Sequence, residues 1–146
     1  MKATVTSARI VLGLVFFAAG LAGFLLINNP PPAPPGLAGA FQDVFFRSHW
    51  VLFVDGVEFI SGVLLLTNRF VPLALTLLGA VLSNILAFHI TMNPAGIVPG
   101  VVLTSLWAVV AWSVRSSLAP LFVAKTQTAK AVVRAIELRS PQHAAA

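Results

Sequence analysis

Apolar residues fall into four long runs along the chain, and short polar or proline-rich segments separate them. The runs cover about residues 10–27, 50–66, 71–88 and 98–114. Each run is close to the roughly 20 residues that a helix needs to cross a hydrocarbon core about 30 Å thick. The pattern therefore predicts an all-α membrane protein, built as a four-transmembrane-helix bundle.

The segment between the first two runs predicts an outer loop and a short helix. Asn28 to Ala40 is rich in proline and glycine, so we expect an extended loop outside the hydrocarbon region. Residues 41–49 carry two phenylalanines at helical spacing, and Asp43 and Arg47 lie four residues apart as a candidate ion pair. We expect a short interfacial helix here that runs into the second span.

Small residues predict where two spans approach each other closely. In the first span Ala19 and Gly23 are four residues apart, and in the third span Gly79, Ser83 and Ala87 form a stripe. Small side chains at such spacing let helix backbones come together in a membrane. We expect both faces to be helix–helix contacts.

The composition agrees with a membrane location and limits the chemistry. The chain has 146 residues, 58% hydrophobic and 9% charged, with a mean hydropathy of +0.96, whereas a soluble domain is about a quarter charged. This length allows one small bundle without a separate soluble domain. The absence of cysteine excludes thiol–disulfide chemistry and Cys-ligated iron–sulfur clusters, so a redox role would need a bound cofactor or a partner subunit.

The distribution of positive charge predicts the orientation. In a four-span arrangement Arg47 is the one basic residue on the outer side, and the other basic residues share the opposite side. The side with the excess is the cytoplasmic one, so both termini are expected in the cytoplasm of a multi-pass protein of the bacterial cytoplasmic (inner) membrane. We interpret the net charge of +5 as topology signals and contacts with anionic lipid, and we expect no nucleic-acid partner.

The chain is expected to consist of a bundle, residues 1–115, and a basic cytoplasmic tail, residues 116–146. In the tail, apolar residues gather on one arc of a helix while Lys130, Arg134 and Glu137 gather on another. This pattern predicts a C-terminal amphipathic helix on the inner leaflet, with a partner-binding helix and a disordered tail as alternatives. The first run also fits a signal peptide, although its cleavage would leave an odd number of spans.

Two carboxyl groups interrupt the second run and suggest a site. Asp55 and Glu58 lie three residues apart and share one face of a helix. A carboxyl group in a membrane span must be paired, protonated or hydrated, and such residues usually mark a functional site. In the predicted orientation, polar residues of the third span reach a similar depth. The candidate ligand or proton site therefore consists of Asp55, Glu58, Asn84 and His89. The secondary candidates are Ser61, Thr104 and Arg69.

Simpler interpretations of the same residues remain open. In one of them, the carboxyl group of Glu58 or Asp55 merely hydrogen-bonds to Asn84, Ser61 or Thr104 and holds the helices together. His89 would be an interfacial histidine bonded to a loop carbonyl.

The sequence gives little sign of metal or catalytic chemistry. No close ligand spacing supports a metal site, so none is expected, and haem ligation by His49 and His89 is disfavoured because both lie at the edge of the bilayer. There is no phosphate loop and no nucleophile–base spacing. The catalytic residues are therefore unknown, and whether the protein is an enzyme stays open, with a non-catalytic role favoured.

Several segments together resemble a known family. These are Glu58 with Gly62, Asn68 to Leu75, Asn84 with Ile85, Phe88 with His89, and Pro94 to Gly96. They are similar to the DoxX-like small membrane proteins of bacteria, over about residues 8–115. The resemblance implies a four-helix inner-membrane bundle in which Glu58, Asn84 and His89 occupy family-pattern positions. The family pattern has a basic residue where this chain has Asp55.

Members of the DoxX-like family are linked to thiosulfate:quinone oxidoreduction or to membrane redox-stress complexes. The resemblance therefore implies a non-catalytic or quinone-proximal accessory subunit in membrane redox metabolism. We expect no covalently bound cofactor, a quinone as the candidate ligand, and the lipid bilayer, a redox subunit or further copies of the chain as partners. The alternatives are a small-solute or lipid carrier and a purely structural membrane partner.

Overall fold

The computed structural model describes residues 2–124 of the chain. The chain divides into two units, Met1–Arg115 and Ser116–Ala146. The start of the second unit contains the end of the one-turn helix α6 (Arg115–Leu118) and the 3-10 helix η2 (Ala119–Phe122). The residues that predict the amphipathic tail helix, Lys130, Arg134 and Glu137, lie outside the described residues.

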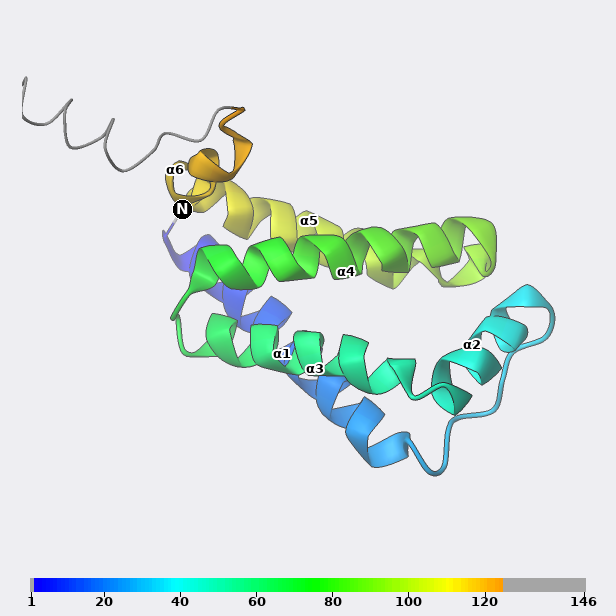
Figure 1. Cartoon of the computed structure of the whole chain (residues 1–146). Helices are drawn as coiled ribbons and strands as arrows, with labels where there is room; N and C mark the ends of the chain where they lie inside the picture. The colour runs from blue at the N-terminus through cyan, green and yellow to red at the C-terminus, as the bar shows by residue number, and fades with distance from the viewer. Residues whose placement is uncertain (1, 125–146) are drawn as a thin grey trace, which may run out of the picture. The chain divides into compact units, whose positions relative to one another are not determined.

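The first unit consists of helices and their connections, and the described residues contain no strand (Figure 1). Its elements are α1 (Lys2–Leu26), α2 (Leu37–Arg47), α3 (Trp50–Leu66), α4 (Val71–Thr91), η1 (Pro94–Gly96) and α5 (Ile97–Ser113).

Several of these helices are suited to a membrane. By length and composition, three segments can each cross a membrane: α1, α4, and η1 together with α5. A fourth candidate is the pair of α2 and α3, whose two helices are bent by 85° relative to each other. The structure thus confirms an all-helical fold with three or four such helices.

The four long helices form a closed ring within the first unit. α1 packs along α3, α3 packs against α4, α4 packs against α5, and α5 returns to α1 (Figure 1). α2 lies beside the start of α3.

Prolines explain several helix boundaries. They cannot continue a helix, but they are tolerated in its first turn. α1 ends before the proline-rich segment that begins at Pro30. Pro72 and Pro99 lie in the first turns of α4 and α5, where an N–H group has no partner within the helix. α1 extends to Lys2, ahead of the apolar run 10–27. One predicted boundary was wrong: α2 begins at Leu37, so the proline-rich loop is shorter than expected.

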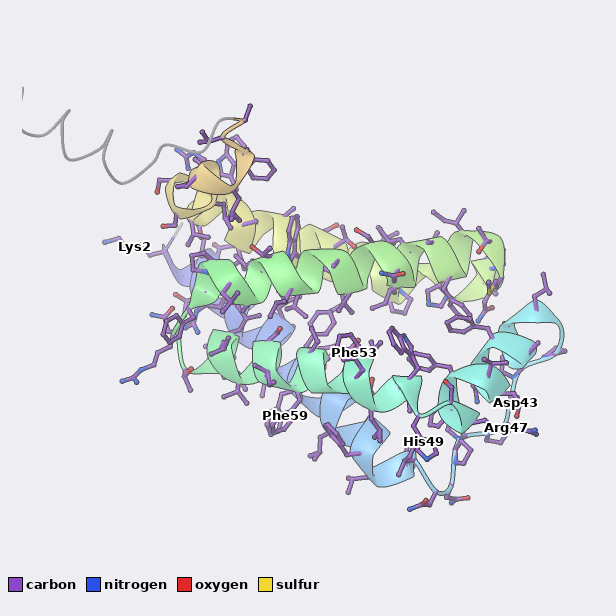
Figure 2. The ribbon with its side chains drawn as sticks, viewed as in Figure 1. Lys2, Asp43, Arg47, His49, Phe53 and Phe59 are labelled. Atoms are coloured by element: carbon purple, nitrogen blue, oxygen red, sulfur yellow. The ribbon has the colours of Figure 1, made fainter. Side chains whose placement is uncertain are left out.

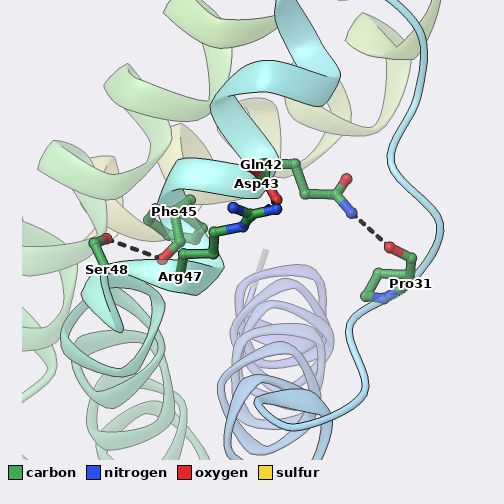
Figure 3. Close-up of polar contacts among 6 residues, drawn as sticks. All are labelled: Pro31, Gln42, Asp43, Phe45, Arg47 and Ser48. Atoms are coloured by element: carbon green, nitrogen blue, oxygen red, sulfur yellow. Dashed lines mark hydrogen bonds and ion pairs between the residues drawn. The ribbon is translucent and has the colours of Figure 1, made fainter.

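α2 leads into α3 through a sharp corner. His49 has a left-handed backbone with a φ of 60°, and the chain turns there by 85° between the two helices. The backbone N–H of Trp50 donates to Oγ of Ser48 at 3.3 Å, and this Oγ donates to the carbonyl oxygen of Phe45 at 3.3 Å (Figure 3). Ser48 therefore provides hydrogen-bonding partners for backbone groups that lose theirs where the helix is interrupted between α2 and α3.

The proline-rich loop between α1 and α2 is held against α2. Nε2 of Gln42 donates to the carbonyl oxygen of Pro31 at 2.7 Å (Figure 3). The predicted ion pair on α2 is present, since Nε of Arg47 lies 2.7 Å from Oδ1 of Asp43. Both side chains are largely exposed, so this pair contributes little to stability.

The packed core lies at one end of the ring. It is formed by the first half of α1, the end of α3, most of α4 and the end of α5. Its buried residues include Leu12, Phe16, Leu65, Leu75, Leu78 and Val110. The opposite end contains the second half of α1 and the start of α3, where the two carboxyl groups lie.

Glycines let α1 and α3 approach backbone to backbone. A Cβ atom at Gly20 would overlap the backbone of Asp55 and Phe59, and one at Gly62 would lie 2.8 Å from Cα of Phe17. Ala19, predicted to face another helix, is instead exposed. Gly23, the other predicted residue, does lie against α3, and Gly20 takes the place of Ala19, since a helix advances 100° per residue.

Two long-range hydrogen bonds join the helices near the core. Nε1 of Trp107 in α5 donates to the carbonyl oxygen of Leu75 in α4 at 2.8 Å, and Arg9 donates to the carbonyl oxygen of Leu65. Gly79 packs against the Trp107 ring. The rest of the predicted small-residue stripe, Ser83 and Ala87, is exposed and does not form a contact between helices of this unit.

We expect Gly20→Ala and Gly62→Ala to lower the thermal stability, because each methyl group would meet the backbone of the facing helix. Such overpacking costs about 1–3 kcal/mol. Gly56→Ala is the matched control on α3, since its Cβ would meet only a ring carbon of Phe24 at 3.8 Å. Thermal unfolding of the purified protein in detergent measures the difference, and equal melting temperatures for all three variants would contradict the close contact.

Candidate functional site

A groove of about 530 Å³ lies between α2, α3 and α4. Its wall is mainly apolar and includes five aromatic side chains, Phe41, Phe45, Trp50, Phe53 and Phe88. The polar residues that line it are Asp55, Glu58, Asn84 and His89. The structure thus brings the four primary candidates of the sequence analysis to one surface.

The three secondary candidates do not line the groove. Ser61 is fully buried, and its Oγ has no partner among the described residues. The hydroxyl group of Thr104 donates to the carbonyl oxygen of Gly100 on its own helix at 2.7 Å. Arg69 is exposed in the turn between α3 and α4, at the core end of the ring.

The two carboxyl groups of α3 have different surroundings. Glu58 is only 7% exposed, although it lines the groove. Asp55 is half-buried, and its carboxyl group lies against Gly23 of α1, where a Cβ atom would overlap it. Among residues 2–124, neither carboxyl group has a hydrogen-bonding or ion-pair partner. The hydrogen bonds that would make Glu58 a link between helices are thus absent from the described part of the chain.

Asn84 and His89 on α4 are each anchored by one hydrogen bond. Nδ2 of Asn84 donates to the carbonyl oxygen of Ala80 at 2.9 Å, which leaves its second N–H and its Oδ1 for another partner. Nδ1 of His89 lies 3.1 Å from the carbonyl oxygen of Asn93, the loop contact that the sequence analysis considered. If Nδ1 carries the proton and donates, Nε2 is left as an acceptor.

Aromatic contacts close one end of the groove. The Phe41 ring stacks on Phe45 of the same helix at 5.5 Å between centroids, and it meets Phe88 of α4 at 5.3 Å. α2 is therefore attached to α4 as well as to α3. The sequence analysis missed this role, although the helical spacing of Phe41 and Phe45 was a usable signal.

The groove opens on the side of the unit. Trp50 and Phe53 line it and are 58% and 63% exposed. Figure 2 shows Phe53 on the side of α3 that faces α4, whereas Phe59 points toward α1. α5 supplies none of the lining residues. Thr104 of α5, a secondary candidate, therefore does not reach the groove, which uses α2, α3 and α4.

The groove carries acidic groups with little positive charge nearby. Among its lining residues His89 is the one that can become cationic. Arg47 near the corner is paired with Asp43. The remaining described basic residues, Lys2, Arg9, Arg69 and Arg115, belong to the elements that meet at the core end of the ring. The site therefore has the polarity to receive a hydrogen-bond donor, a proton or a cation.

The lining residues can bind a polar group. In residues 2–124 no three His, Asp or Glu side chains come close enough to hold a metal ion. Carboxyl groups, an amide and an imidazole can hold a proton or orient a polar head group.

In comparisons with known proteins, no family model, no curated protein and no solved structure matches this chain. The resemblance to DoxX-like proteins therefore stays a prediction.

We expect Glu58→Leu to leave the thermal stability of the ligand-free protein unchanged or to raise it. The change replaces a buried carboxyl group that has no described partner with an apolar side chain of similar size. Trp107→Phe is the control, because it removes an interhelical hydrogen bond and should cost about 0.5–1 kcal/mol. A loss of stability in Glu58→Leu as large as that in Trp107→Phe would mean that the carboxyl group holds the helices together.

Proposed function

We propose that this protein is a non-catalytic membrane protein that binds a small amphipathic molecule in the groove between α2, α3 and α4. Its role is that of an accessory subunit in membrane redox metabolism, and its ligand is a quinone, as the DoxX-like resemblance implies.

One observation supports the binding role most directly. A mainly apolar groove of about 530 Å³ opens on the side of the bundle and contains two carboxyl groups without a described protein partner. Its volume falls within the range of about 300–1,000 Å³ that is usual for small-molecule sites. Because the opening lies along helices of membrane-spanning composition, a molecule dissolved in the bilayer reaches it sideways, without first entering water.

The chemistry of a quinone head group fits the lining residues. Its carbonyl oxygens accept hydrogen bonds, and the second N–H of Asn84 and a protonated Glu58 carboxyl group can donate them. Its ring can pack against Phe53 or Phe88, and an isoprenoid tail can leave through the side opening.

The topology proposed for this role has four spans, with both termini in the cytoplasm of a bacterial cell and α2 at the outer surface of the cytoplasmic membrane. In this arrangement α2 lies in the interface and α3 crosses as the second span. The support is the unequal charge: four described basic residues belong to the core end of the ring, and Arg47 belongs to the other end.

The cysteine-free sequence allows a direct test of this topology. With single cysteines introduced into intact cells, we expect Asn28→Cys to react with a membrane-impermeant maleimide from outside and Thr67→Cys to react only after the membrane is opened. Both positions are exposed in connections between helices. The reverse labelling pattern would overturn the orientation.

Quinone binding is tested by tryptophan fluorescence. Titration of the purified protein with a short-chain quinone should quench the emission of Trp50 saturably, because this ring lines the groove. The quenching should be lost in Trp50→Phe and retained in Trp112→Phe, which removes a tryptophan that is 72% exposed and outside the groove.

A variant that fills the groove distinguishes quinone binding in the groove from quinone binding elsewhere on the protein surface. Ala80→Phe adds a ring inside the groove at an exposed position of α4, whereas Ser83→Phe adds one on the same helix outside the groove. We expect only Ala80→Phe to abolish saturable quenching. Equal quenching in both variants would exclude the groove as the quinone site.

The side opening also favours one alternative, carriage of a lipid or small amphipathic solute. A carrier would move its ligand between leaflets or across the membrane, so uptake into vesicles that depends on Glu58 would favour it over an accessory subunit. A purely structural partner would show neither saturable ligand binding nor uptake.

A further inference from the structure

We propose that the groove selects ligands with a positively charged ammonium head group and an apolar body. This inference rests on the proposed function only in so far as the groove binds an amphipathic molecule. It gives that molecule a positive charge and is therefore an alternative to the neutral quinone. The ammonium group can belong to a membrane lipid or to a freely diffusing amphiphile, and the experiment below distinguishes these sources.

The carboxyl groups supply the first argument. Glu58 is more than nine-tenths buried, lines the groove, and has no partner among residues 2–124. Asp55 lies one helical turn away on the same helix and also lacks a described partner. Two acids at this spacing repel each other when both are ionised, and a cation between them removes the repulsion. The described protein offers no lysine or arginine in the groove for this purpose.

The aromatic wall supplies the second argument, independent of the first. Phe41, Phe45, Trp50, Phe53 and Phe88 line the same space, together with aliphatic side chains of α3 and α4. The faces of such rings attract cations, and several rings around a quaternary ammonium group form a known type of binding site. A wholly aliphatic wall would have excluded water equally well without attracting a positive charge.

The position of Asp55 supplies the third argument. Its carboxyl group is supported from behind by Gly23 of α1, the position at which a Cβ atom would overlap it. The glycine therefore allows the carboxyl group of Asp55 to lie against α1, and Asp55 is also among the residues that line the groove. Both acidic residues thus belong to the same lining as the aromatic side chains.

The test uses two probes of the same shape. Benzyltrimethylammonium carries a positive charge, and neopentylbenzene replaces its nitrogen with carbon and is neutral. Both are titrated into the full-length protein in a non-ionic detergent, with Trp50 emission and native mass spectrometry as readouts. After correction for partition into the micelle, we expect the cation to bind at least about tenfold more tightly, a difference that a single charge interaction can supply.

Variants locate the effect. Glu58→Gln and Asp55→Asn keep the shape of the side chains and remove their charge, so each should weaken binding of the cation by about tenfold or more and leave the neutral probe unaffected. Asp43→Asn is the matched control, because it removes an exposed acid outside this groove. Equal weakening by Asp43→Asn, or equal affinity for the two probes, would overturn the inference.

The remaining outcomes are also decisive. Saturable binding of quinone or of the neutral probe, without preference for the cation, would overturn the inference and leave the proposed function intact. No saturable binding of any probe would overturn both.

If added phosphatidylethanolamine or phosphatidylcholine competes with the cation, the head group comes from a membrane lipid. If phosphatidylglycerol and the ammonium lipids alike fail to compete, it comes from a free amphiphile, and both results support the inference.

Discussion

The direct contact between the backbones of α1 and α3 is the constraint on which the site depends. Gly20 lies against the backbone at Asp55 and Phe59, so the two helices meet without intervening side chains at the level of the acids. In a membrane, helices are not driven together by the hydrophobic effect, and close packing at small residues takes its place. This contact fixes the depth and rotation of α3. It therefore determines that Glu58 lines the groove and that the carboxyl group of Asp55 lies against Gly23 of α1.

The two ends of the ring are built differently. The core end is filled by Leu12, Phe16, Leu75 and other buried apolar side chains. At the other end the 85° corner at His49 directs α2 away from the axis of α3, and Phe41 then joins α2 to Phe88 of α4. Instead of a filled core, this end has a side groove. One chain thus combines a tightly packed end with an end that is open to a ligand.

Much of this arrangement could be predicted from the sequence. The four apolar runs identify the long helices, and the spacing of Asp55 and Glu58, with the depth of Asn84 and His89, predicts that these residues approach one another. The side on which they meet could not be predicted, because it depends on which glycine of α1 faces α3. A shift of one residue, from Ala19 to Gly20, rotates a helix by about 100°. The left-handed backbone of His49 was not predicted either, since only a few per cent of residues other than glycine adopt it, even though histidine is enriched among them.

The division between a packed end and an open end has an evolutionary consequence. Changes in a packed interior are costly for folding, whereas substitutions at exposed positions are usually tolerated. Trp50, Phe53 and Asn84 are exposed and contribute no buried core contacts. Descendants of this chain can therefore change what the groove accepts while they inherit an unchanged scaffold. Their specificities would diversify faster than their architecture.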